Sequence, residues 1–105
     1  MSFVYSRRFV GVQQALSGSW VDLYTVPAGY LALVKYVGYV NDSSATIDLK
    51  VGRNSSQQLL RINALAPGAS GFWLPFLAFS AGEHISVLGN AGTITLEVHG
   101  YLLVL

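Results

Sequence analysis

The chain has no cysteine among its 105 residues. Neither a disulfide nor a cysteine-based zinc site can therefore form, and a domain this small must be stabilised by its core or by association. Charged residues make up only 10% of the chain, against about 25% in an ordinary soluble domain. The net charge is +1 and the cations are scattered, which argues against a nucleic-acid partner bound through a basic patch.

Long apolar runs are missing as well. The longest uncharged apolar stretches, Gly71–Phe79 and Gly100–Leu105, fall well short of the roughly 20 residues that a membrane-spanning helix requires. We expect no secretory signal, because the first eight residues lack an apolar segment followed by a cleavage site. Apolar residues nevertheless make up 52% of the chain. Without a membrane as partner, we expect much of this apolar surface to be buried against other subunits.

Helical periodicity is also absent, and a period of two takes its place. Polar and aliphatic residues alternate from Thr46 to Val51 and again from Thr93 to Leu102, which indicates strands with one wet and one dry face. Strand-like runs separated by turn signals are expected at 3–13, 20–26, 30–41, 45–52, 58–65, 71–79, 83–89 and 93–104.

Eight short strands at this spacing predict a single all-β domain over residues 1–105. The expected architecture is an eight-stranded antiparallel β-sandwich of the jelly-roll type, in which residues 1–19 form either an N-terminal arm or an edge strand. Pro27 and Gly29 mark one of its turns, and Gly29 is expected to adopt a positive φ.

The run from Tyr30 to Val40 is apolar on both faces apart from Lys35. One face can line the core, and the other carries one of two alternating sets, depending on register. The two sets are Tyr30, Val34, Tyr36 and Val40, or Leu31, Leu33, Val37 and Tyr39. A second apolar face on an antiparallel strand needs a cover, which either a neighbouring subunit or the chain's own loops can supply.

A candidate interface follows from this run, from the aromatic residues and from the two chain ends. Arg7 and Arg8 either pair with acidic groups of a partner or are solvated on an edge strand. The candidate interface residues are Tyr30, Val34, Tyr36, Tyr39, Arg7, Arg8, Trp73, Leu103 and Leu105.

Groups suited to catalysis are few, and the sequence has no Gly-x-Ser-x-Gly elbow and no phosphate-binding loop. If the Asn90–Ala91 dipeptide is a hairpin tip, His84 lies opposite Glu97, with Cβ atoms about 5 Å apart, and His99 lies diagonal to it. Such a cluster can in principle bind zinc, but an exposed His–carboxylate pair is the favoured interpretation. Tyr101 is one of two apolar residues that fall on this polar face. We predict no metal, no cofactor and no enzymatic activity.

Four segments share a pattern with a known class of proteins: Leu23–Gly29, Leu33–Val37, Val40–Leu49 and Leu77–Val87. Over residues 20–52 and 74–102 the chain resembles small structural proteins of tailed bacteriophages. In those proteins a strand ends in Val-Pro-Ala-Gly, the next runs to an Asn at a turn, and a Gly before an acidic residue opens a later strand. The first twenty residues lie outside the resemblance.

The resemblance implies a virion component, either a head decoration (cement) protein or a tail accessory subunit. Virions assemble in the reducing cytoplasm of the host bacterium, where a chain without cysteine is expected. We predict a homo-oligomer, with a trimer favoured, that contacts major capsid or tail proteins. The alternative is a carbohydrate-binding jelly-roll module, such as a lectin or a tail receptor-binding domain. It requires an exposed aromatic side chain flanked by Asp, Asn or Arg in a concave site.

Overall fold

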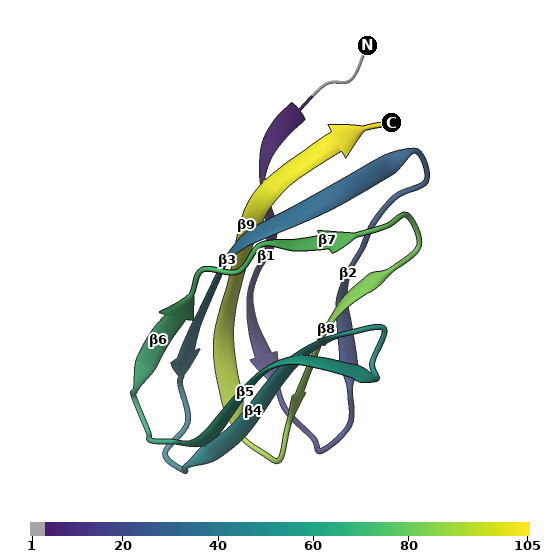
Figure 1. Cartoon of the computed structure of the whole chain (residues 1–105). Coiled ribbons are helices and arrows are strands. Elements are labelled where there is room, and N and C mark those ends of the chain that lie inside the picture. The colour runs from purple at the N-terminus through teal and green to yellow at the C-terminus, as the bar shows by residue number, and fades with distance from the viewer. Residues whose placement is uncertain (1–3) are drawn as a thin grey trace.

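The computed structural model describes residues 4–105, which form strands and turns without a helix. Its strands are β1 (Val4–Ala15), β2 (Val21–Thr25), β3 (Tyr30–Asn41), β4 (Ile47–Arg53), β5 (Gln57–Leu65), β6 (Ser70–Trp73), β7 (Leu77–Phe79), β8 (His84–Gly89) and β9 (Thr93–Val104). Sheet A has the order β1-β9-β3-β6, with β7 also paired to β3, and sheet B has the order β2-β8-β4-β5 (Figure 1). Within residues 4–105 no helix is long and apolar enough to cross a membrane.

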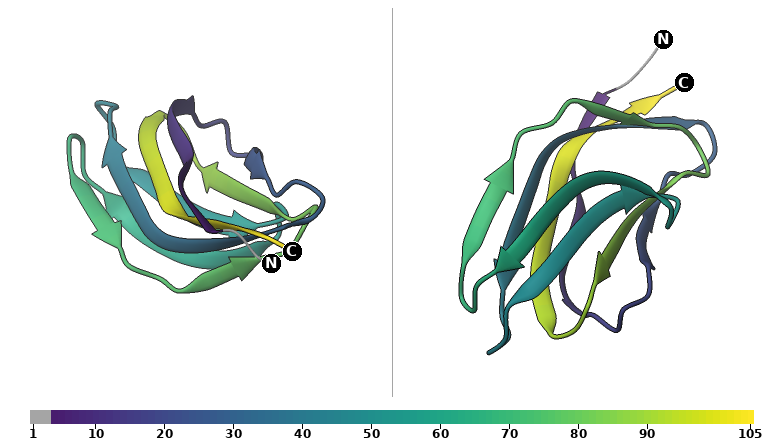
Figure 2. Two further views of the ribbon diagram at one scale, coloured as in Figure 1. Left: turned by 90° about the horizontal axis from the view of Figure 1, so that it is seen from above. Right: turned by 60° about the horizontal axis from the view of Figure 1, so that its bottom comes forward.

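The strands pair as they would in one long hairpin that has been rolled up. β1 pairs with β9, β2 with β8, β3 with β6 and β7, and β4 with β5. The pairs β3–β9 and β4–β8 then join these nested pairs into two layers (Figure 2). This is the jelly-roll arrangement, and it confirms the predicted all-β antiparallel sandwich.

One expected strand, 71–79, is divided into β6 and β7. Pro75 lies between them and has no N–H to donate to a ladder. Both pieces pair with β3, so together they occupy the position of one jelly-roll strand. Leu74 and Phe76, on either side of the proline, are exposed.

The core lies between the two sheets and follows the period of two. On β9, Ile94, Leu96 and Val98 are fully buried, while the residues between them face outward. Asn41 is the one fully buried amide side chain among the described residues. Its Nδ2 donates to the carbonyl oxygens of Ala45 (2.8 Å) and Leu65 (2.9 Å), and its Oδ1 accepts from the Ser43 N–H. Asn41 therefore ties the end of a sheet A strand to sheet B.

Two β-bulges flank the same point of β9. The register shifts between Arg8 and Val10 on β1 and between Val34 and Tyr36 on β3. Because a bulge inserts one residue, it exchanges the inward and outward sets of the strand. Neither alternating set predicted for β3 is therefore correct along its whole length.

The bulge corrects one candidate interface residue. Ala32 and Val34 point inward before the bulge, and Val37 points inward after it. Val34, predicted to lie at an interface, is only 2% exposed and belongs to the core. Leu31, Leu33 and Tyr36 are left on the outer face of sheet A.

Candidate interaction surfaces

Part of the outer face of sheet A is apolar. The register places Leu31 beside Leu103 and Leu33 beside Tyr101, and antiparallel partners share a face. Phe72 lies on the same face, since it is the partner of the outward Gly38. We call this surface the outer patch, and it comprises Leu31, Leu33, Tyr36, Phe72, Phe76, Tyr101 and Leu103.

Aromatic contacts hold part of the outer patch in place. The Tyr36 ring stacks on Phe72 with centroids 6.2 Å apart and meets the His99 ring edge-on at 5.5 Å. The Lys35 ammonium lies 4.3 Å from the centre of the Phe76 ring, so this cation covers an aromatic face. Phe72 and Phe76 are nevertheless 65% and 71% exposed. Large exposed aromatic side chains of this kind are typical anchors of protein interfaces.

A groove of about 500 Å³ adjoins the outer patch. Its lining residues include Tyr36, Phe72, Thr95 and Glu97. The groove therefore brings aromatic rings and a carboxylate to the same concave surface.

The candidate interface residues are distributed over three environments. Tyr36 and Leu103 belong to the outer patch, and Leu105 is exposed at the end of the chain. Arg7 and Arg8 are exposed on β1, the edge strand of sheet A. A third group is half-buried and packs against the core: Tyr30, Tyr39 and Trp73.

Sequence reasoning did not select Phe72, Phe76 or Tyr101 as interface residues. Two signals in the sequence point to them. Pro75 interrupts the predicted strand beside both phenylalanines, and Tyr101 is an apolar residue on the polar alternation of β9.

The predicted pairing of His84 with Glu97 is wrong. β8 belongs to sheet B and β9 to sheet A, so the segment around Asn90 crosses between the sheets and is not a hairpin turn. Glu97 instead contacts His99 on its own strand, with Oε2 and Nε2 3.1 Å apart, and the Nδ1 of His84 is bonded to the Thr25 hydroxyl (2.7 Å). Among residues 4–105, no group of three potential ligands is placed to hold a metal ion.

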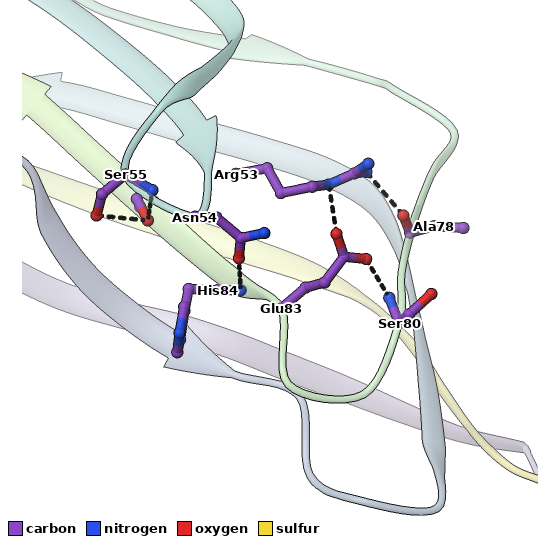
Figure 3. A network of polar contacts seen from close by, with 8 residues as sticks. Arg53, Asn54, Ser55, Ala78, Ser80, Glu83 and His84 are labelled. Atoms are coloured by element: carbon purple, nitrogen blue, oxygen red, sulfur yellow. Dashed lines mark hydrogen bonds and ion pairs between the residues drawn. The ribbon is translucent and has the colours of Figure 1, made fainter.

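A polar cluster joins the turns at one end of the roll (Figure 3). The guanidinium of Arg53 donates from Nη2 to the Ala78 carbonyl (2.7 Å), its Nε lies 3.6 Å from Glu83 Oε2, and it covers the Phe79 ring at 4.5 Å. Glu83 in turn accepts from the Ser80 N–H. These contacts connect β4 of sheet B with β7 of sheet A, which gives the cluster a structural role.

Asp22, Ser55 and Ser86 form a second part of this cluster. The hydroxyls of Ser86 and Ser55 both donate to Asp22 Oδ1, and these hydrogen bonds lower the pKa of the Asp22 carboxyl below its usual value. His84 is bonded to Thr25 and not to either serine. In a Ser-His-Asp site a histidine lies between the serine and the carboxylate, whereas here both serines contact the carboxylate directly, so this arrangement is unlike such a site.

Comparisons with known proteins give similarity of fold. No protein-family model and no curated protein sequence matches the chain. Among solved structures, a chain of the acid-stable capsid of Helicobacter pylori bacteriophage KHP30 is similar with a TM-score of 0.66 and 14% identity, covering 100% of this chain and 94% of that one.

Two further structures share the fold. The Drosophila NLP core, described in relation to pentamer formation and histone binding, has a TM-score of 0.51 and 19% identity, covering 91% of this chain and 98% of that one. A chain of infectious bursal disease virus has a TM-score of 0.54 and 10% identity over 98% of this chain. The present chain spans only 32%, about a third, of that viral chain.

Proposed function

We propose that this chain is a structural virion protein of a tailed bacteriophage, a capsid decoration protein that acts through contacts with copies of itself and with major capsid or tail proteins. The observation that carries the proposal is the outer patch. Seven large apolar side chains gather on one outer face of a small jelly roll with few charged residues. A surface of this kind is costly to leave in water and is suited to a protein partner.

The similarity to the KHP30 capsid chain supports the same proposal. Because 100% of this chain matches 94% of that one, the two chains are of nearly equal length. A phage capsid therefore contains a small chain of the same fold and size. The non-enzymatic role we propose agrees with the hydrogen bonding of Ser55 and Ser86, whose hydroxyls contact the Asp22 carboxylate, while His84 is bonded to Thr25.

Self-association through the outer patch is the part of the proposal that purified protein can test. A stable contact buries about 800 Å² on each partner. We expect light scattering after gel filtration to give three times the chain mass of 11.3 kDa. The pentamer described for the Drosophila NLP core provides the alternative order. A mass of 11.3 kDa at micromolar concentration contradicts self-association.

Matched variants locate the contact. The double variant Phe72→Ser, Phe76→Ser removes two exposed rings of the outer patch and is expected to be monomeric. The control Tyr5→Ser, Val12→Ser removes two exposed apolar side chains of β1 that lie outside the patch, and it should keep the oligomer. Electron microscopy of capsids mixed with the protein then tests decoration. Bare capsids at saturating protein contradict the decoration role.

A carbohydrate-binding module is the second candidate, and the groove beside the outer patch favours it. Tyr36 and Phe72 provide rings that can stack on a sugar, and Glu97 provides a hydrogen-bond acceptor beside them. A glycan array with the Phe72→Ser variant as control distinguishes the two functions. Specific glycan binding that this variant loses supports the carbohydrate-binding function.

A further inference from the structure

The outer face of sheet B carries a recess that neither proposed function uses. It has a volume of about 400 Å³ and lies over β4, β5 and β8. We call it the sheet B recess, and the lining residues that matter are Asp48, Lys50, Arg61, Asn63, Leu88 and Asn90.

Two cations face each other in the recess. Lys50 on β4 is the direct cross-strand partner of Arg61 on β5, and like charges placed directly opposite each other destabilise a sheet. Within residues 4–105 no carboxylate lies within 4.0 Å of either cation, since the ion pairs found there are Arg53–Glu83 and His99–Glu97. Only six cations occur in the chain, so this pair is a concentrated positive charge that an external anion would neutralise.

The one nearby carboxylate is already engaged with the backbone. Asp48 Oδ1 accepts a hydrogen bond from the Ala64 N–H at 2.8 Å. Ala64 has a φ of 55°, which is unfavourable for a residue other than glycine. It belongs to a β-bulge in which Asn63 and Ala64 together oppose Asp48. Asp48 therefore stabilises the bulge and forms no ion pair with Lys50 or Arg61. Two cations and one carboxylate leave the recess with a net positive charge.

The bulge also orients the arginine. Asn63 Oδ1 accepts from Arg61 Nε at 2.8 Å, so the guanidinium is held through its Nε, and its terminal nitrogens stay available to a ligand. Asn90 Oδ1 accepts from the Asp48 N–H at 3.0 Å, so the amide nitrogen of Asn90 is oriented away from that bond. The terminal N–H groups of a guanidinium match the two oxygens of a carboxylate.

We propose that the sheet B recess binds the carboxylate of an acidic segment of a partner protein, with Lys50 and Arg61 as the principal donors. Two features favour a peptide over an acidic sugar. β5 is the edge strand of sheet B, so a partner segment can run along its outer backbone. The lining residues include no aromatic ring on which a sugar can stack, while Leu88 can contact the methylene groups of a glutamate side chain. This proposal stands independently of the virion role and of the outer patch.

The first test uses the unaltered protein and a hexaglutamate peptide as probe. In a ¹⁵N–¹H titration at low salt, shifts of the backbone amides should cluster at 48–50, 61–63 and 88–90. A hexaglutamine peptide should produce none of these shifts. Shifts spread evenly over the surface, or no shifts at millimolar peptide, overturn the proposal.

The second test compares variants that remove cations inside the recess with a control that removes cations elsewhere. We expect Lys50→Gln and Arg61→Gln each to weaken hexaglutamate binding by about tenfold or more, because each variant removes a charge-assisted hydrogen bond to the ligand carboxylate. The double variant Arg7→Gln, Arg8→Gln removes two cations from the edge of sheet A and should bind within twofold of the parent protein. If the control loses as much affinity for hexaglutamate as the recess variants, the attraction is unspecific and the proposed site is overturned.

A third arm separates the two sources of carboxylate. Trigalacturonate presents carboxylates on sugars, and we expect it to bind more weakly than hexaglutamate. Trigalacturonate that binds more tightly at the same amides overturns the peptide assignment. The peptide site and self-association can fail separately. If the protein is monomeric and still binds hexaglutamate in the recess, self-association is refuted and the peptide site is supported.

Discussion

The outer faces of sheets A and B have opposite chemistry although both sheets follow the same alternation. Sheet A presents Phe72, Phe76 and Tyr101 to solvent, whereas sheet B presents Asp48, Lys50 and Arg61. The inner residues of both sheets must fill one shared core, and so they are largely apolar, with Asn41 as an exception. The outer positions are free of that requirement. The jelly roll can therefore carry two independent surfaces, one suited to apolar contacts and one to anions.

The strongest way to disturb sheet A alone is to alter Gly100. A Cβ at this position collides with the carbonyl oxygen of Leu33 on β3, so the two backbones must separate. We expect Gly100→Ala to destabilise the fold by about 3 kcal/mol, which lowers the melting temperature by roughly 10–20 °C. Thermal denaturation followed by circular dichroism measures the change. As a control, Gly11→Ala meets only the flexible end of the Arg8 side chain and should melt close to the parent protein.

The turn that links the sheets gives the next largest effect. Gly29 has a φ of 84°, as predicted, and the Tyr30 N–H closes the turn by donating to the Pro27 carbonyl at 3.2 Å. No atom lies near a Cβ built at Gly29, so a side chain there is strained by the backbone and not by crowding. We expect Gly29→Val to cost about 1–3 kcal/mol and Gly29→Asn clearly less, because Asn tolerates this conformation. If the Val and Asn variants have the same melting temperature, backbone strain at the positive φ is not the cause.

The polar cluster on sheet B should make a pH-dependent contribution to stability. The hydrogen bonds from Ser86 and Ser55 depress the folded pKa of Asp22 below its ordinary value of 3.8. Asp22 therefore adds stability that is complete above about pH 5 and is lost as the pH falls through the depressed folded pKa. We expect Asp22→Asn to melt a few degrees below the parent at pH 7, roughly 1–3 °C for an exposed group. The difference should shrink at pH 3, and a constant difference at both pH values refutes the assignment.

A similarly small effect is expected at His84. Its ring contacts the Thr25 hydroxyl at the rim of sheet B, and a single polar contact of this kind contributes about 1 kcal/mol or less. His84→Ala should therefore leave the fold and the oligomer nearly intact. EDTA should leave the melting temperature of the parent protein unchanged. A decrease of more than about 8 °C with EDTA indicates a structural metal and overturns the non-metal interpretation.

Alternation in the sequence predicts which residues of β4 and β9 face inward, and turn residues predict nearly all strand limits. Both signals are local, because they depend on neighbours along the chain. Alternation does not determine which strands pair, and this is why His84 and Glu97 were assigned to one hairpin. Consecutive strands of this roll, such as β8 and β9, usually lie in different sheets.

The candidate surfaces were predicted less completely for a related reason. The bulge at Lys35 reverses the alternation of β3, so that Val34 lies in the core and Tyr36 on the outer face, and a single lysine in an apolar run does not by itself indicate a bulge. The sheet B recess depends on the bulge at Ala64, which also has no sequence signature. Whether Tyr36 and Leu103 form an interface stays a prediction until the oligomer is measured.

The nested pairing of strands has a consequence for synthesis of the chain on the ribosome. The pair β4–β5 is closed by a short turn, whereas β1 pairs with β9, the last strand to be made. Contacts between distant segments form slowly because a long loop must close first. Until β9 emerges, β1 has no strand to complete its ladder, and the inward side chains Phe9 and Val10 lack their final cover. We therefore expect folding to proceed from the middle of the chain outward, and a nascent chain that stalls before residue 93 to leave sheet A open at its centre.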